Sequence, residues 1–179
     1  GGYAGACPVR SDEINFSKGT DKATELERTA NVAKRALQKY KLTSKDVLMI
    51  VSNSGVNHAP VEAAILAKKK KIKTIALTSY KFSKQAPLSK LKKRLYEICD
   101  VYIDNKIPPG DAVVGVNKMM VGPVSTITGS FILNSILVEL ANLLKNEKIF
   151  PFYISVNMPG AKENNDKLVK KYKKSNIHL

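Results

Sequence analysis

The feature that constrains this chain most is a short apolar run that ends in a polar turn. Residues 47–51 read Val-Leu-Met-Ile-Val without polar alternation, and Ser-Asn-Ser-Gly follows at 52–55. An unbroken apolar run of this length is typical of a strand that is buried on both faces of a parallel sheet. Pro60 stands where the first turn of a helix accepts proline, which predicts a helix over residues 60–70.

A turn between a buried strand and a helix is suited to binding an anion. The free backbone N–H groups at the start of the helix and the helix dipole both attract negative charge. Ser52 and Ser54 add side-chain donors, and Gly55 lets the backbone approach a ligand closely. We therefore predict a site for a phosphate ester at this turn. The alternative is that the hydroxyl groups only cap the turn.

The remainder of the chain alternates helical and strand patterns. Helices are predicted over residues 21–40, 88–98, 125–145 and 165–172, and strands over 72–77, 101–103, 112–116 and 150–156. The strand at 112–116 is expected at a sheet edge or in a hairpin, and a turn is expected at residues 17–20. This alternation predicts an α/β fold, with a parallel sheet that helices cover on both faces in a Rossmann-like α/β/α sandwich.

Hydroxyl side chains follow a second predicted strand and precede a later helix. Thr78 and Ser79 come after the strand at 72–77, and Ser125 and Thr126 begin the helix at 125–145. Ligands of parallel sheets lie beyond the carboxyl ends of the strands. We expect these hydroxyl groups to meet the 52–55 turn around one ligand.

The formal net charge of +15 raises the question of nucleic acid. Nucleic-acid-binding surfaces usually concentrate basic residues on one face and use arginine and aromatic side chains. Here the excess is nearly all lysine, and it is spread from Lys18 to Lys174. We therefore expect a general attraction of anions and no specific nucleic-acid partner.

Several other classes of site lack a sequence signal. Cys7 and Cys99 are too few and too far apart for a disulfide framework or a paired-cysteine metal site, and no dinucleotide or P-loop fingerprint is present. We expect no metal and no cofactor. No apolar run approaches the roughly 20 residues of a membrane span, so we expect no membrane partner and a cytoplasmic location.

The hydroxyl-rich turns resemble those of the SIS (sugar isomerase) family of phosphosugar-binding domains. That family includes phosphoheptose isomerases, the isomerase half of glucosamine-6-phosphate synthase, N-acetylmuramic acid 6-phosphate etherases and sugar-sensing transcription regulators. The resemblance is closest to a bacterial branch of SIS-domain proteins and covers nearly the whole chain. It rests on residues 50–57 with Pro60 and Glu62, 75–79, 104–111, 122–126, 155–157, Gly160 and Asn164–Asn165.

The resemblance implies one SIS-like domain over residues 1–179. Members of the branch begin with a helical segment, a first strand and a first ligand loop with a nearby Glu, all ahead of a Gly-Gly that Gly1–Gly2 resembles, and this sequence lacks them. The resemblance also implies assembly as a dimer or tetramer, and the apolar helix at 125–145 is suited to subunit packing. The implied phosphate-binding residues are Ser52, Asn53, Ser54, Gly55, Thr78, Ser79, Ser125 and Thr126.

The function implied is binding of a hexose or amino-sugar phosphate by a sugar-phosphate isomerase or lyase. Phosphate binding would supply remote binding energy, and a carboxylate or imidazole would move a proton between adjacent carbons. The catalytic group is not identified; Glu62, His58 and His178 are candidates, although the helix dipole alone accounts for Glu62.

Two other functions remain open. A non-catalytic phosphosugar sensor would keep the phosphate turns and need no base. A generic nucleic-acid-binding module would bind any polyanion with steep salt dependence.

Overall fold

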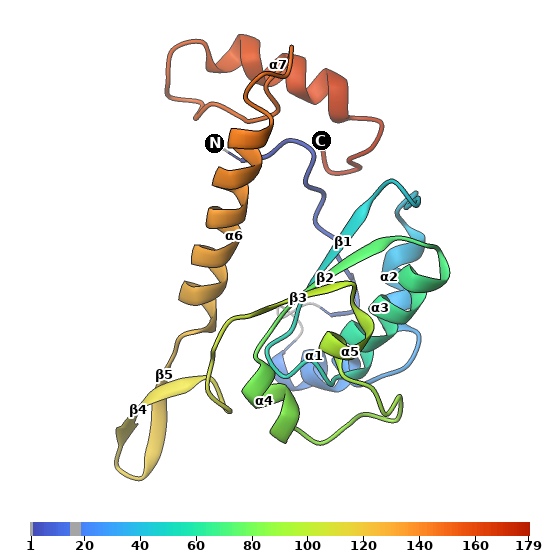
Figure 1. The fold of residues 1–179 in the computed structure, drawn as a ribbon, viewed down its shortest axis with the longest axis vertical. Coiled ribbons are helices and arrows are strands. Elements are labelled where there is room, and N and C mark those ends of the chain that lie inside the picture. Colours follow the sequence, from blue (N-terminus) through green and yellow to red (C-terminus); the bar gives the residue numbers. More distant parts are fainter. Residues whose placement is uncertain (1, 15–18) are drawn as a thin grey trace. The chain divides into compact units, whose positions relative to one another are not determined.

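The computed structural model describes residues 2–14 and 19–179, and the chain divides into two compact units (Figure 1). One unit comprises residues 10–129, and the other comprises residues 1–9 with 130–179. Part of the turn predicted at residues 17–20 lies outside the described residues.

The unit of residues 10–129 is built on a parallel sheet. Its strands are β1 (Val47–Val51), β2 (Lys73–Thr78) and β3 (Val101–Asp104), in the order β1-β2-β3. Val51 pairs with Leu77, and Leu77 pairs with Ile103. The predicted α/β class with a parallel sheet is confirmed.

Helix α3 (His58–Lys69) connects β1 to β2 and packs with α2 (Val32–Gln38) and α5 (Leu95–Ile98) on one face of the sheet. Apolar side chains from these elements bury one another, and this burial is the main stabilising contribution to the unit. The core comprises Leu37, Leu48, Ile50, Val61, Ala64, Ala67, Ile72, Ala76, Leu95 and Ile98.

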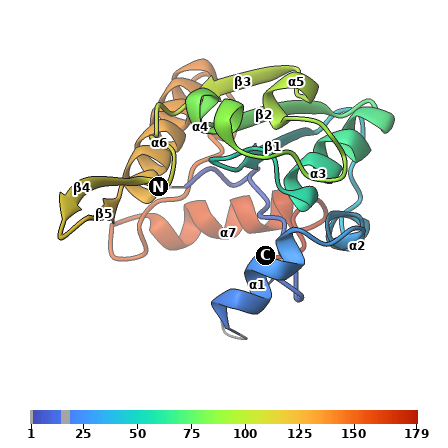
Figure 2. The same ribbon diagram turned by 90° about the horizontal axis from the view of Figure 1, so that it is seen from below.

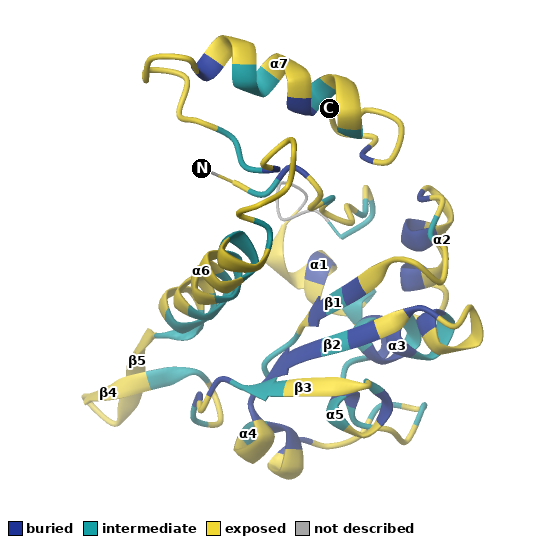
Figure 3. Ribbon diagram, turned by 45° about the horizontal axis from the view of Figure 1, so that its top comes forward, coloured by how far each residue is buried: buried dark blue, intermediate teal, exposed yellow. Residues whose placement is uncertain are grey.

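Strand β1 differs from the expected burial on both faces. Leu48 and Ile50 are buried in the core, whereas Val47 and Val51 are 60% and 57% exposed (Figure 3). Alternate side chains of a strand point to opposite faces. Within the described residues of the unit, α2, α3 and α5 pack on the face that Leu48 and Ile50 share.

Two of the predicted helices have different bounds. The pattern at 21–40 forms two helices, α1 (Thr20–Glu27) and α2, because the chain breaks at residues 28–31, where Asn31 has a left-handed φ of 66°. The segment at 88–98 is helical only in α5, and a short helix, α4 (Tyr80–Gln85), precedes it. Between α4 and α5, the Arg94 guanidinium donates to the carbonyl oxygens of Ser83 and Ala86 and holds this segment as a loop.

The strand predicted at 112–116 lies in a hairpin. Strand β4 (Ala112–Val116) pairs antiparallel with β5 (Met119–Pro123). The two tip residues, Asn117 and Lys118, have φ values of 47° and 63°, and two left-handed residues are typical of the type I′ turn that suits a two-residue hairpin. Helix α6 (Ser125–Leu143) begins directly after the hairpin (Figures 1 and 2).

Helix α6 has no buried residue, and Ile127 and Phe131 are 71% and 73% exposed. By length and composition alone it could cross a membrane, a test that the core helix of a soluble protein also passes. An exposed apolar helix is equally compatible with the predicted subunit packing. Homo-oligomerisation stays a prediction.

The unit of residues 1–9 with 130–179 contains helix α7 (Ala161–Tyr172), which begins before the predicted residue 165. The predicted strand at 150–156 is reduced to one isolated antiparallel bridge between Tyr3 and Phe152. The side chains of Asn164 and Asn165 donate to the carbonyl oxygens of Phe152 and Ile154, so α7 holds this segment.

Candidate functional site

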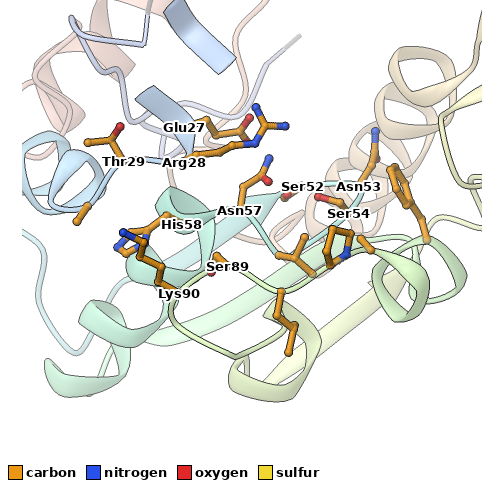
Figure 4. A pocket seen from close by; sticks show the side chains of 16 residues that line it. Glu27, Arg28, Thr29, Ser52, Asn53, Ser54, Asn57, His58, Ser89 and Lys90 are labelled. Atoms are coloured by element: carbon orange, nitrogen blue, oxygen red, sulfur yellow. The ribbon is translucent and has the colours of Figure 1, made fainter. Parts of the chain in front are cut away.

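The turn after β1 lines a cleft of about 960 Å³ (Figure 4). The hydroxyl of Ser52 accepts the Gly55 N–H at 3.2 Å, which closes the turn. The carbonyl oxygen of Asn53 accepts the Ser79 N–H at 3.0 Å and the Thr78 hydroxyl at 3.2 Å. Hydrogen bonds from the end of the neighbouring strand β2 therefore fix the shape of the turn.

Gly55 is required at this turn for two reasons. Its φ is 59°, a left-handed value that side chains disfavour. A Cβ at this position would also lie 2.8 Å from Thr78 Oγ1 and 3.2 Å from Leu95 Cβ. The close approach of the turn to β2 and α5 therefore depends on glycine.

The turn presents unused hydrogen-bond donors at the start of α3. Within the described residues, the backbone N–H groups of Ser54, Asn57, His58 and Ala59 have no acceptor, and the Ser54 hydroxyl has no partner. Ser54, Asn57 and His58 line the cleft. The N-terminus of α3 adds its positive dipole end. This arrangement can bind an oxyanion such as a phosphate.

The first wall of the cleft comes from the break between α1 and α2, at residues 27–30. Glu62 of α3 secures this break. Its carboxylate accepts the backbone N–H groups of Asn31 at 2.9 Å, Ala33 at 3.0 Å and Lys34 at 3.4 Å. Glu62 thus supplies the N-terminal cap that α2 does not obtain from its own sequence.

The second wall is the loop at residues 86–90, which follows α4. Arg94 anchors it, since its guanidinium donates to the carbonyl oxygen of Ala86 at 3.2 Å and to that of Ser83. Lys90 projects from this loop into the lining of the cleft.

The charges that line the cleft are Arg28 and Lys90 against Glu27. Arg28 caps α1 and donates from one guanidinium nitrogen to the Thr24 carbonyl oxygen at 3.2 Å. His58, the first residue of α3, also lines the cleft and is only 8% exposed. The balance of fixed charge favours an anionic ligand.

Comparison with known proteins identifies the family of this chain. The family description "SIS domain" matches residues 1–79. UPF0309 proteins of Brucella canis, Brucella abortus and Brucella anthropi are each 39% identical to this chain over 181 residues. The alignment covers the whole of this chain and 74% of each relative. The chain belongs to the UPF0309 family of SIS-domain proteins.

The predicted phosphate-binding residues of this UPF0309 chain separate into groups. Ser52, Asn53 and Ser54 line the cleft, and Gly55 lies buried beneath them. Thr78 and Ser79 adjoin the turn, as expected, but both are 0% exposed.

The hydroxyl groups of Thr78 and Ser79 are engaged within the protein. That of Thr78 donates to Asn53, and that of Ser79 donates to the Ile107 carbonyl oxygen at 2.5 Å and accepts the Phe82 N–H at 3.1 Å. In this structure the two residues support the turn and do not face the cleft.

Ser125 and Thr126 are not among the residues that line the cleft. Asp111 caps the start of α6: its carboxylate accepts the Val124 and Ser125 N–H groups at 3.1 and 2.8 Å and the Ser125 hydroxyl at 2.5 Å. Of the three hydroxyl-rich segments expected to converge, the turn at 52–55 lines the cleft, and Thr78 and Ser79 support that turn from within the protein. The hydroxyl of Ser125 donates to the carboxylate that caps this helix.

The three catalytic candidates also lie in different places. Glu62 caps α2, and its carboxylate is occupied by backbone N–H groups. His178 belongs to the other unit, where Nε2 lies 2.9 Å from the Pro8 carbonyl oxygen. Only His58 lines the cleft.

The structure adds Glu27, Arg28, Ser89 and Lys90 to the site. No sequence signal points to these four residues, because the pattern at 21–40 suggests one continuous helix and residues 86–90 carry no recognisable motif. Within the described residues, no group of three or more His, Cys, Asp or Glu side chains is placed to hold a metal ion.

Proposed function

We propose that the cleft binds a hexose or amino-sugar phosphate through its phosphate group. The observation that carries the proposal is the set of unused donors at the start of α3: the Ser54 hydroxyl and the N–H groups of Ser54, His58 and Ala59. A phosphate oxygen would accept these hydrogen bonds while the helix dipole stabilises its charge. Membership in a SIS-domain family supports the same ligand class.

The dimensions and charge of the cleft fit such a ligand. Pockets for small molecules usually enclose about 300–1,000 Å³, and this cleft encloses about 960 Å³. Arg28 and Lys90 stand on opposite walls and attract an anion before it reaches the turn. The sugar ring would then occupy the space between the walls.

We further propose that the protein acts on this ligand as a sugar-phosphate isomerase or a related enzyme. Two groups that can transfer a proton, Glu27 and His58, line the same cleft as the phosphate-binding turn. Within the described residues, neither side chain has a hydrogen-bond or ion-pair partner. A non-catalytic sensor is the alternative, since it would use the turn and leave these groups idle.

Calorimetric titration tests the binding proposal. Glucosamine 6-phosphate or N-acetylglucosamine 6-phosphate should bind the full chain, and the corresponding free sugars should bind poorly. Hydrogen bonds to charged groups contribute roughly 1.5–3 kcal/mol each, so Ser54→Ala should weaken binding by about tenfold or more. Ser44→Ala is the matched control, because Ser44 is an exposed turn residue outside the cleft.

Two results would overturn the site. One is equal affinity for the phosphorylated and free sugars. The other is an unchanged affinity in Ser54→Ala when circular dichroism shows that the variant folds normally.

Catalysis has a separate test. An isomerase exchanges the proton on the carbon next to the carbonyl group, so incubation in D₂O should place deuterium at C2 of a bound aldose phosphate. Proton NMR would detect the loss of that signal. Tight binding without deuterium incorporation would favour the sensor.

A further inference from the structure

His58 is a buried residue whose imidazole lines the cleft. The residue is 8% exposed and lines the cleft, and within the described residues neither ring nitrogen has a hydrogen-bond partner. Because the imidazole lines the cleft, its ring nitrogens are available to hydrogen-bond a ligand there. The phosphate-binding turn does not use it.

His58 and Lys90 lie away from the phosphate turn. Figure 4 shows both at the side of the cleft opposite to Ser54. They come from different elements, the first turn of α3 and the loop after α4. A ligand whose phosphate sits at Ser54 would therefore extend its other end toward an imidazole and an ammonium group.

We propose that the cleft selects a phosphorylated sugar acid, with its phosphate at the turn and its carboxylate at His58 and Lys90. This inference rests on the proposed function and specifies its ligand. A carboxylate favours the protonated imidazole and accepts charge-assisted hydrogen bonds from both cations. A neutral hydroxyl group at the same place would engage the imidazole and leave the ammonium without a counterion.

The other charged groups of the cleft are Glu27 and Arg28, both from the end of α1. They are adjacent in sequence and of opposite sign, so their effects on a distant carboxylate largely offset each other. A carboxylate bound beside His58 would favour the protonated form of the imidazole. Binding of the acid should therefore take up a proton near neutral pH, where imidazoles titrate.

A matched pair of ligands tests the proposal. Gluconate 6-phosphate and glucitol 6-phosphate share an open six-carbon chain and the same phosphate, and differ only in a carboxylate or an alcohol at C1. Titration calorimetry of the full chain at pH 6.5, in two buffers of different ionisation heat, gives the affinity and the proton uptake together. The phosphate's own titration is common to both ligands. We expect about tenfold tighter binding of the acid, with additional proton uptake.

Variants locate the effect. His58→Gln and Lys90→Gln should each remove most of the preference for the acid, and His58→Gln should also remove the additional proton uptake. Lys45→Gln is the control for loss of one positive charge, because Lys45 precedes β1 and the cleft lies beyond the other end of that strand. If His58→Gln does not fold, the Lys90→Gln variant still tests the proposal, because Lys90 is exposed and its replacement should not disturb folding.

The outcomes distinguish the two proposals. Equal affinity for the acid and the alcohol would overturn the selection of a sugar acid and leave the phosphate site standing. A preference that survives Lys90→Gln would overturn it as well. Failure of both phosphorylated ligands to bind would overturn the proposed function together with this inference.

Discussion

Replacement of Glu62 should destabilise the protein through α2, a helix that Glu62 does not belong to. In Glu62→Ala the N–H groups of Asn31, Ala33 and Lys34 lose their acceptor. Asn31 and Lys34 are exposed and can bind water instead, whereas Ala33 is 8% exposed. The desolvated amide of Ala33 therefore carries most of the penalty.

The magnitude follows from the two shorter hydrogen bonds, at 2.9 and 3.0 Å. Hydrogen bonds to a charged acceptor contribute roughly 1.5–3 kcal/mol each, and the lower end applies because Glu62 is half-buried. Glu62→Ala should lower the free energy of unfolding by about 2–3 kcal/mol. Glu62→Gln retains one carbonyl acceptor and should lower it by about 1 kcal/mol.

Urea denaturation followed by far-ultraviolet circular dichroism measures these differences. Glu25→Ala is the control, because Glu25 is an exposed acid on α1 and should change stability by less than about 0.5 kcal/mol. A Glu62→Ala change no larger than that of the control would refute the capping role. A fully stable Glu62→Gln protein that had lost all activity would instead indicate catalysis by Glu62.

Two further changes test the site and its support. Gly55→Ala should destabilise the protein by at least about 2 kcal/mol more than Gly110→Ala in the same urea assay. Both glycines have left-handed φ values, which cost an alanine roughly 1–2 kcal/mol at either position. Of the two, Gly55 is the one where an added Cβ would lie within 3.4 Å of other atoms. Similar losses of stability in the two variants would show that the turn can move away from β2. For Asp100, hydrogen bonds from the side chain and backbone of Thr74 lower the pKa of the carboxyl group below its ordinary value of 3.8. Its stabilisation is therefore complete above about pH 3.8 and is lost as the pH falls through the lower folded-state pKa, so Asp100→Asn should show a smaller loss of stability on acidification than the wild type. An equal loss of stability on acidification in the wild type and in Asp100→Asn would contradict this role of Asp100.

The sequence predicted the strand and helix on either side of the 52–55 turn because their signals are local. An apolar run, a Ser-Asn-Ser-Gly turn and Pro60 specify strand, turn and helix within about twenty residues, and β1 and α3 follow that order. Ser52 and Ser54 belong to this turn, and both line the cleft. The hairpin alternative at 112–116 also follows from local turn chemistry.

The walls of the cleft could not be predicted in the same way. No glycine or proline marks the break after Glu27; Asn31 adopts a left-handed conformation where a carboxylate from another helix caps α2. That contact spans thirty-one residues of sequence, so no local pattern reveals it. The hydroxyl of Thr78 looks the same in a sequence whether it faces a ligand or, as here, supports a neighbouring carbonyl group.

The cap that Asp111 places on α6 makes the hairpin between them a closed loop. Asp111 immediately precedes β4, and its carboxylate binds Val124 and Ser125 immediately after β5, so both ends of the ribbon are joined at one side chain. The distance between those ends does not depend on how far the ribbon extends. Relatives could therefore gain or lose pairs of residues at the tip, beside Asn117 and Lys118, without shifting the register of α6. The same tip would accept a fluorescent label or an affinity tag at a point remote from the helix start.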